Sequence, residues 1–254
     1  SFMDSPDEVV RTGVARDVVF LEAVEINPVV VHGGGKRISR ALEAAGIETR
    51  FVNGLRYTDA ESVQVVDRVL SQEINAEIVE MINSLGGEAK GFAGTEIFSC
   101  NRHAPDGEDY GFVGEVTAVN TGPLEDCIAQ GITPVISPTA RDEDGQIYNC
   151  NADVAAARAA IALAAKRLVF MSDVPGLLRD PADEASLISH LDIAEVDDLK
   201  QAGIIASGMI PKVDSATTAI HAGVDKVSFV DGRIHHAVLL EIFTDKGVGT
   251  EIVK

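Results

Sequence analysis

The chain has 254 residues, of which 46% are hydrophobic, so it is long enough for one large α/β domain or for two joined lobes with a sizeable core. Its 40 acidic side chains outnumber 21 basic ones, and the formal net charge is −19. Nucleic acids and anionic membranes attract a positive surface, so this charge argues against both as partners. An anionic small-molecule substrate would have to be held by a few local cations.

The cysteines and the hydropathy pattern predict a cytoplasmic protein. The three cysteines are odd in number and lack metal-ligand spacing, which favours a reducing compartment without a disulfide framework (Cys100, Cys127 and Cys150). No apolar run approaches the roughly 20 residues of a membrane span, and the pattern of a signal peptide is not seen.

A glycine-rich turn between a strand and a helix is the first motif with chemical meaning. Three β-branched residues, Val29–Val31, predict a strand buried on both faces in a parallel sheet. Gly33–Gly35 follow, and the apolar spacing of Ile38–Ala45 predicts a helix. The first N–H groups of such a helix lack partners and can bind an anion, although the turn could also bind nothing. The turn fits neither a P-loop nor a dinucleotide-binding pattern.

The segments around this turn predict a helix at Val9–Leu21 and a short strand at Thr49–Val52. An α/β chain that opens on a helix suggests a first strand upstream of Ser1. Asn53 and Gly54 indicate a turn, and Thr58 or Asp59 can cap a long helix to about Leu85. Arg56 stands just before that helix, where its planar guanidinium could bind a carboxylate or simply be solvated.

The middle of the chain predicts short strands, a polar flap at Arg102–Tyr110 and a turn at Asp142–Gly145. The expected strands and helix are Ala89–Phe92, Glu96–Cys100, Gly111–Val119, the helix Pro123–Gln130 and the strand Ile132–Ser137. Asn149, Asn151 and Asp153 then alternate at the entry of an alanine-rich helix, 153–165. A helix cap needs one such side chain, so the other two favour ligand binding.

The last third of the chain alternates strands and helices, as expected for a mostly parallel sheet covered on both faces. Ser172–Leu178 follow a buried strand, at the end where open α/β sheets bind ligands. The predicted elements are the strand Leu168–Met171, the helix Ile193–Ala202, a helix from Lys212 to Ala222, the strand Lys226–Val230, the helix Ala237–Phe243 and the strand Thr250–Val253.

A set of motifs in order gives the chain a resemblance over essentially its whole length. The motifs are His32–Gly35, Asn53–Thr58, Asn149–Asp153, Asp173–Leu178, Gly208–Lys212, Asp231–Arg233, Leu240–Thr244 and Gly247–Thr250. Together they resemble the acetylglutamate kinase branch of the amino acid kinase family, which has no P-loop.

The resemblance implies an αβα sandwich with a mostly parallel central sheet, of the carbamate kinase-like type. It implies an N-terminal lobe, 1–147, with the amino-acid site and the dimer contact. It also implies a C-terminal lobe, 148–254, with the ATP site, the two lobes sharing one continuous sheet. The implied reaction is ATP-dependent phosphorylation of the γ-carboxylate of N-acetyl-L-glutamate in arginine biosynthesis, with Mg²⁺ and without protein ligands to a metal.

The resemblance also implies roles for individual residues. Gly34 and Gly35 would offer backbone groups to the substrate, Arg56 would clamp its α-carboxylate, and Asn149 would be a second substrate contact. Asp153 would organise the catalytic lysines, and Lys212 would stabilise the transferring phosphoryl group. The implied nucleotide-binding residues are Asp173, Val174, Pro175, Gly176, Leu177, Leu178, Ile204, Ile205, Ala206, Gly208 and Met209.

Two departures from the family pattern keep alternatives open. The family places a catalytic lysine and a glycine pair at the end of a first strand, upstream of Ser1; Lys36 could stand in, but we expect it to face solvent. Pro211 and Glu241–Thr250 resemble the arginine-inhibited branch, whereas Ser228 stands where that branch carries histidine. Inhibition by L-arginine is therefore an expectation with features for and against it. A homodimer or a homohexamer is expected. The alternatives are an N-acetyl-aminoadipate kinase and an inactive arginine-sensing or partner-binding module.

Overall fold

The computed structural model describes residues 8–206 and 208–254, and it divides into two compact units. Unit 1 comprises residues 18–158, and unit 2 comprises residues 8–17 and 159–254. The division after Arg158 lies within helix α7 (Ala152–Ala162), whereas the resemblance implies a lobe boundary between residues 147 and 148. Each unit is described by itself below.

Unit 1 contains a parallel three-stranded sheet in the order β1 (Val30–Val31), β7 (Thr133–Ile136), β4 (Ala89–Phe92). All four residues of the central strand β7 are buried. Both residues of β1 are only half-buried, so the expectation of a strand buried on both faces was wrong for β1. In this sheet β1 pairs with β7 alone, which leaves its other edge without a ladder partner among the described strands of unit 1.

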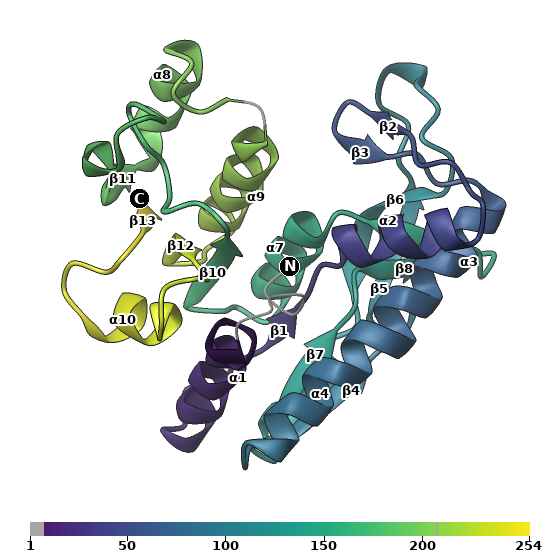
Figure 1. Cartoon of the computed structure of the whole chain (residues 1–254), viewed down its shortest axis with the longest axis horizontal. Coiled ribbons are helices and arrows are strands. Elements are labelled where there is room, and N and C mark those ends of the chain that lie inside the picture. The colour runs from purple at the N-terminus through teal and green to yellow at the C-terminus, as the bar shows by residue number, and fades with distance from the viewer. Residues whose placement is uncertain (1–7, 207) are drawn as a thin grey trace. The chain divides into compact units, whose positions relative to one another are not determined.

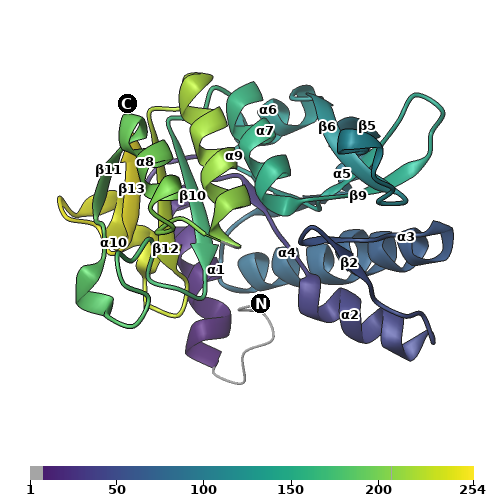
Figure 2. The ribbon, with the colours of Figure 1, turned by 90° about the horizontal axis from the view of Figure 1, so that it is seen from above.

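A long helical region packs on this sheet, as predicted, but a π-helical segment interrupts it. It consists of α3 (Ala60–Asp67), the π-helix η2 (Arg68–Ile74) and α4 (Asn75–Ser84). Figure 1 shows α4 running along β4 and β7. Figure 2 shows α2 (Gly35–Ala44) beside α3. Buried side chains of α2, α3 and η2 form one apolar cluster: Ile38, Leu42, Val66, Val69, Leu70 and Ile74.

Asp59, rather than Thr58, caps this helical region. Its carboxylate accepts a hydrogen bond from Ser62 N at 2.8 Å, and this bond lowers the pKa of Asp59. We expect Asp59→Ala to lower the free energy of unfolding by about 1 kcal/mol at pH 7. Because the folded-state pKa is depressed, this contribution is present above the unfolded value near 4 and is lost as the pH falls through the folded value.

Chemical denaturation at several pH values measures this effect of the cap. Asp59→Asn is the matched control, since asparagine caps helices about as well as aspartate and should change the stability little at pH 7. A loss for Asp59→Ala that persisted undiminished at pH 2 would contradict the carboxylate's role.

Four further strands of unit 1 close into a small barrel, which the sequence did not predict. The barrel order is β5 (Phe98–Arg102), β6 (Val113–Val119), β9 (Ile147–Cys150) and β8 (Thr139–Arg141). The predicted strand Glu96–Cys100 was wrong at its start, because α5 (Gly94–Ile97) takes up those residues. Gly94 N donates to Ser137 Oγ at 2.8 Å, so a distant residue stabilises this short helix.

The remaining elements of unit 1 connect these parts. They are the hairpin β2 (Phe51–Val52) and β3 (Leu55–Arg56), the 3-10 turn η3 (Pro105–Gly107) in the predicted flap, and α6 (Gly122–Ile128). Asn53 and Gly54 have φ values of 47° and 81°, so the predicted Asn-Gly turn is confirmed as the tip of this hairpin.

Unit 2 contains a second sheet, in the order β10 (Arg167–Ser172), β12 (Lys226–Asp231), β13 (Thr250–Val253), β11 (His190–Asp192). β10 is parallel to β12 and β11 is parallel to β13, whereas β12 and β13 are antiparallel. The described ladders form separate sheets, and the continuous sheet that the resemblance implies stays a prediction.

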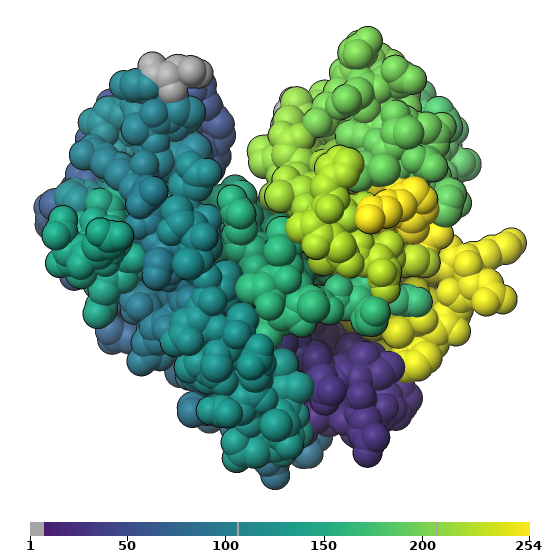
Figure 3. Space-filling model, turned by 180° about the vertical axis from the view of Figure 1, so that it is seen from behind, coloured from purple at the N-terminus to yellow at the C-terminus, as the bar shows by residue number. Residues whose placement is uncertain are grey.

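The helices of unit 2 lie close to their predicted positions. They are residues 8–17 of α1 (Glu8–Ala23), the end of α7, α8 (Val196–Gln201), α9 (Met209–His221) and α10 (Ala237–Phe243), with the 3-10 turns η4 (Glu184–Ser186) and η5 (Ile193–Glu195). Figure 3 shows the end of the chain, in yellow, on the surface of this unit. The α/β class with parallel strands is confirmed. Among the described helices none is both long and apolar enough to cross a bilayer.

Candidate active site

The glycine turn opens helix α2 and leaves its first amide groups available to an anion. Gly34 is the N-cap, no side chain caps the helix, and Gly34 O accepts from Ile38 N at 2.9 Å. A Cβ on Gly34 would lie 2.6 Å from Ile74 Cδ1 and 2.7 Å from Leu70 Cδ2. The backbone at Gly34 therefore packs directly on the core, and its position depends on the absence of a side chain.

We expect Gly34→Ala to lower the free energy of unfolding by about 1–3 kcal/mol, because the new methyl group overpacks a buried contact. Chemical denaturation measures this effect. Gly35→Ala is the control, since a Cβ on Gly35 meets nothing within 4 Å, and its stability should equal or exceed that of wild type. Equal stabilities for both variants would contradict the close approach at Gly34.

Arg56 stands beside this turn with its guanidinium held by neutral groups. Its Nη2 donates to Gly35 O at 3.1 Å and to Ser39 Oγ at 2.9 Å, and Nη1 donates to Thr49 Oγ1 at 3.3 Å. The residue is 9% exposed, and burial lowers its pKa. No carboxylate pairs with it among the described residues. A buried cation with only neutral partners is stabilised by an incoming anion.

Asn149 is joined to Arg56 through a buried threonine. Asn149 Nδ2 donates to Thr58 Oγ1 at 3.2 Å, and Thr58 Oγ1 donates to Arg56 O at 2.9 Å. Thr58 is fully buried. Unit 1 thus brings together the four predicted substrate-binding residues Gly34, Gly35, Arg56 and Asn149. Sequence reasoning considered Thr58 only as a helix cap, because nothing local in the sequence points to its distant partner.

The polar cluster at the start of α7 separates into different roles. Asn151 Oδ1 accepts from Asp153 N at 2.8 Å and from Val154 N at 3.2 Å, so Asn151 caps the helix. Asn149 belongs to strand β9, where it contacts Thr58 instead. Asp153 lies half-buried in the first turn of α7. Only one of the three side chains is used as a cap.

In unit 2, Lys212 lies in the first turn of α9 and close to strand β10. Its Nζ is 5.9 Å from the ring centroid of Phe170, which stacks on Phe229 of β12 at 5.5 Å. The helix begins at Met209 rather than at Lys212, because Pro211 is tolerated in a first turn, where its missing N–H has no helical partner. Gly208 is the N-cap, without a side-chain cap.

The predicted nucleotide-binding residues divide into exposed and buried side chains. Asp173 and Val174, directly after β10, are exposed. Leu177 and Ile205 are 2% and 1% exposed, so their side chains belong to the core of unit 2. Leu177 N donates to Thr250 Oγ1 at 2.8 Å, which ties this loop to β13. The residues Pro175, Gly176, Leu178, Ile204, Ala206 and Met209 lie in the same two segments.

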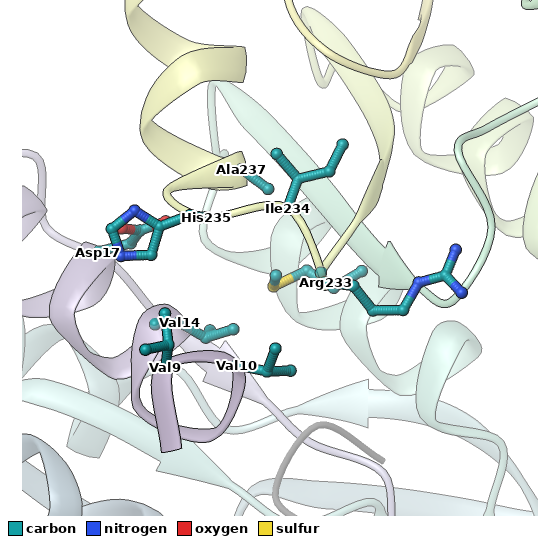
Figure 4. Close-up of a pocket in the computed structure, with 11 residues that line it drawn as sticks. Val9, Val10, Val14, Asp17, Arg233, Ile234, His235 and Ala237 are labelled. Atoms are coloured by element: carbon teal, nitrogen blue, oxygen red, sulfur yellow. The ribbon is translucent and has the colours of Figure 1, made fainter. Parts of the chain in front are cut away.

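A pocket of unit 2 and the exposed side chain of Lys36 are two further features of the described chain. A small pocket of unit 2 lies between Val9, Val10 and Val14 of α1 and the loop with Arg233 and Ile234 (Figure 4), and none of the predicted site residues lines it. Lys36, the suggested stand-in for the missing lysine, is exposed as expected.

Comparison with curated sequences gives close relatives along most of the chain. The amino acid kinase family model matches residues 1–231. Acetylglutamate kinase from Syntrophomonas wolfei is 46% identical over 241 residues, covering 94% of this chain and 84% of the relative. Acetylglutamate kinase from Synechococcus elongatus is 47% identical over 246 residues, covering 97% of this chain and 82% of the relative.

Solved structures share the fold at low sequence identity. An N-acetylglutamate synthase from Neisseria gonorrhoeae, complexed with coenzyme A and N-acetyl-glutamate, matches with a TM-score of 0.86 and 24% identity, covering 98% of this chain and 56% of that one. Carbamate kinase from Giardia lamblia bound to AMP-PNP matches with a TM-score of 0.70 and 13% identity, covering 100% of this chain and 94% of that one. These matches show the fold, and the family model and the curated relatives above show that the chain belongs to the amino acid kinase family.

Proposed function

We propose that the protein transfers the γ-phosphoryl group of ATP to the γ-carboxylate of N-acetyl-L-glutamate. The observation that carries this proposal is the buried guanidinium of Arg56, which has only neutral partners and donates to the backbone of the glycine turn. The relatives named acetylglutamate kinase support the substrate, because they match most of this chain at up to 47% identity. The alternative, an N-acetyl-aminoadipate kinase, has no relative among these matches to support it.

The substrate carries two carboxylates, and unit 1 offers two places for anionic groups. Arg56 would hold the α-carboxylate through its positive charge and through the N–H groups that do not donate to Gly35 O, Ser39 Oγ or Thr49 Oγ1, and Asn149 would hydrogen-bond the substrate nearby. The backbone N–H groups at Gly34 and Gly35 would face the γ-carboxylate and the phosphoryl group that it receives. A carboxylate titrates near pH 4, so this nucleophile needs no general base at pH 7.

The chemical need is therefore positive charge on the migrating group, as in phosphoryl transfer generally. Lys212 and the open N-terminus of α9 would supply that charge in unit 2. Asp153 would act as a positioning residue for cationic side chains rather than as a proton acceptor. The side chains of Val174 and Ile210 are apolar and exposed. Val174 lies in the predicted nucleotide-binding segment 173–178 and Ile210 directly follows the segment 204–209, so a nucleotide base could pack on them.

Mg²⁺ fits this scheme as a companion of ATP. No group of three or more histidine, cysteine, aspartate or glutamate side chains stands ready for a metal ion within residues 8–206 and 208–254. Magnesium in phosphoryl transfer is commonly held by substrate phosphates with one or two carboxylates, so a dedicated protein cage is not required. Bound with ATP, Mg²⁺ would neutralise phosphate charge.

Coupled ADP release tests the proposal. The protein is assayed with ATP, Mg²⁺ and N-acetyl-L-glutamate, with hydroxylamine present to trap the acyl phosphate as a hydroxamate. Turnover should disappear without the acetylated substrate, and kcat/KM should be lower for N-acetyl-α-aminoadipate, L-glutamate and L-aspartate. Higher kcat/KM for the longer acid would contradict the proposed substrate, and absence of all turnover would favour the inactive sensor.

Regulation and assembly stay predictions. Binding of L-arginine, a homodimer or homohexamer, and a cytoplasmic location each follow only from the resemblance or from the composition. The assignment of amino-acid binding to the first lobe and of ATP binding to the second is part of the same proposal.

A further inference from the structure

A side-chain amide in unit 1 ties together the ends of all three parallel strands. Asn75 is 3% exposed and is the first residue of α4, directly after the π-helical segment. Its Nδ2 lies 2.9 Å from Val135 O of β7 and 3.4 Å from Phe92 O of β4. The same Nδ2 lies 3.3 Å from Nε2 of His32, the residue that follows β1.

The backbone is shaped to admit this amide. A Cβ on Gly91 of β4 would lie 2.1 Å from Asn75 Oδ1, so only glycine leaves room there. The π-helix that precedes Asn75 also supplies Leu70 and Ile74, the two side chains packed on Gly34. Single-turn π-helical segments occur frequently at functional sites. The same helical region thus contacts the glycine turn both through apolar packing and through Asn75.

The partners of His32 define its protonation. A carbonyl oxygen can only accept, so the contact with Gly33 O places the imidazole proton on Nδ1, and Nε2 is then an acceptor that faces the amide nitrogen of Asn75. His32 Nδ1 then donates to Gly33 O at 3.1 Å. Burial lowers the pKa of His32 to about 4, so the ring stays neutral in this arrangement around pH 7. His32 is 7% exposed.

A held carbonyl group fixes the amide group on the other side of the same peptide. The peptide bond is planar and trans, so Gly33 C=O and Gly34 N–H point in opposite directions. Three consecutive glycines have more backbone freedom than three residues of any other type. Contacts with residues outside the turn are therefore needed to keep their backbone in one conformation. His32 supplies that restraint at Gly33, and Asn75 holds His32.

We propose that His32 and Asn75 are positioning residues, which aim the Gly34 N–H at the acyl phosphate as it forms. This inference rests on the proposed function. Loss of the pair should lower kcat while leaving KM for ATP unchanged, because the restraint acts on the orientation of a donor to the transferring group. Complete loss of one such donor costs on the order of 10²–10³ in kcat, and a misaimed donor should cost less.

Two substitutions of His32 separate the restraint from mere packing. In His32→Asn the side-chain amide nitrogen occupies the place of Nδ1 and can still donate to Gly33 O. In His32→Gln the amide reaches the place of Nε2 and can meet Asn75, but it leaves Gly33 O without its donor. We expect kcat within about 3-fold of wild type for His32→Asn and about 10- to 100-fold lower for His32→Gln.

Asn75→Asp and Asn83→Asp form a matched pair on one helix. Asn75→Asp removes the amide donor to His32 but keeps the donor to Gly33 O, so kcat should fall by less than in His32→Gln. Asn83 lies near the other end of α4, where its Oδ1 accepts from Ala89 N at 2.7 Å. Asn83→Asp keeps an acceptor at that place and should leave kcat within about 2-fold of wild type. Equal losses in both variants would overturn the proposal.

A readout independent of turnover distinguishes this inference from the proposed function. Amide hydrogen exchange of the full chain should be faster at Gly34 in His32→Gln than in His32→Asn and wild type. If wild type shows no turnover, the proposed function fails, yet faster exchange still supports the restraint. Equal kcat for the two His32 variants, or equal exchange at Gly34 in both, would refute the positioning role.

Discussion

Replacing Lys212 with alanine should lower kcat by about 10²–10³, with a much smaller effect on KM for N-acetyl-L-glutamate. Lys212 stands in the first turn of α9, and its charge is expected to act on the phosphoryl group in the transition state rather than on the bound amino acid. Loss of an interaction made only in the transition state lowers kcat and kcat/KM together. Steady-state kinetics of ADP release at saturating ATP measures both parameters.

Lys200→Ala is the matched control for Lys212→Ala. Lys200 belongs to the same unit, and its Nζ forms an ion pair with Asp214 of α9 at 2.6 Å. Removal of this surface pair costs little stability and should leave kcat within about 3-fold of wild type. Similar kcat values for the two variants would remove Lys212 from the catalytic machinery. Thermal unfolding of both variants shows whether a lost activity reflects a lost fold.

Replacing Arg56 with alanine should raise KM for N-acetyl-L-glutamate by about 10- to 100-fold, with KM for ATP unchanged. A hydrogen bond to a charged group is worth about 1.5–3 kcal/mol, and each 1.4 kcal/mol corresponds to a tenfold change. Arg56→Lys should recover only part of this loss, because one ammonium group cannot reproduce donors on two nitrogens, Nη2 to Gly35 O and Ser39 Oγ and Nη1 to Thr49 Oγ1. Initial rates over a range of both substrates separate the two KM values.

Arg50 offers a control on the same hairpin. Its guanidinium lies over the ring of Tyr57 at 4.0 Å, and the residue is exposed. Arg50→Ala removes one positive charge from the same region, so general electrostatic attraction of the anionic substrate would be weakened in both variants. KM should rise strongly only for Arg56→Ala. An unchanged KM for Arg56→Ala would exclude the clamp on the α-carboxylate.

The candidate site was predictable where a residue's role follows from its own backbone surroundings. The glycine turn before α2, the Asn-Gly turn before Arg56 and the polar entry of α7 each combine local turn or cap chemistry with a nearby helix or strand. The link from Asn149 through Thr58 to Arg56 spans residues about ninety positions apart along the chain. No local pattern encodes such a contact, so only the folded chain reveals it.

Hydrophobic periodicity together with glycine, proline and capping residues was enough to predict the α/β class, most of the helices and the family motifs, because these depend on short-range patterns. Contacts made in the folded chain close the β5–β6–β9–β8 barrel and give Gly94–Ile97 its helical conformation, and neither feature was predictable from local patterns. Tertiary structure also decided that Asn75 meets His32. These features depend on contacts between distant residues, whose free energy is gained only when the strands have paired and the side chains are buried.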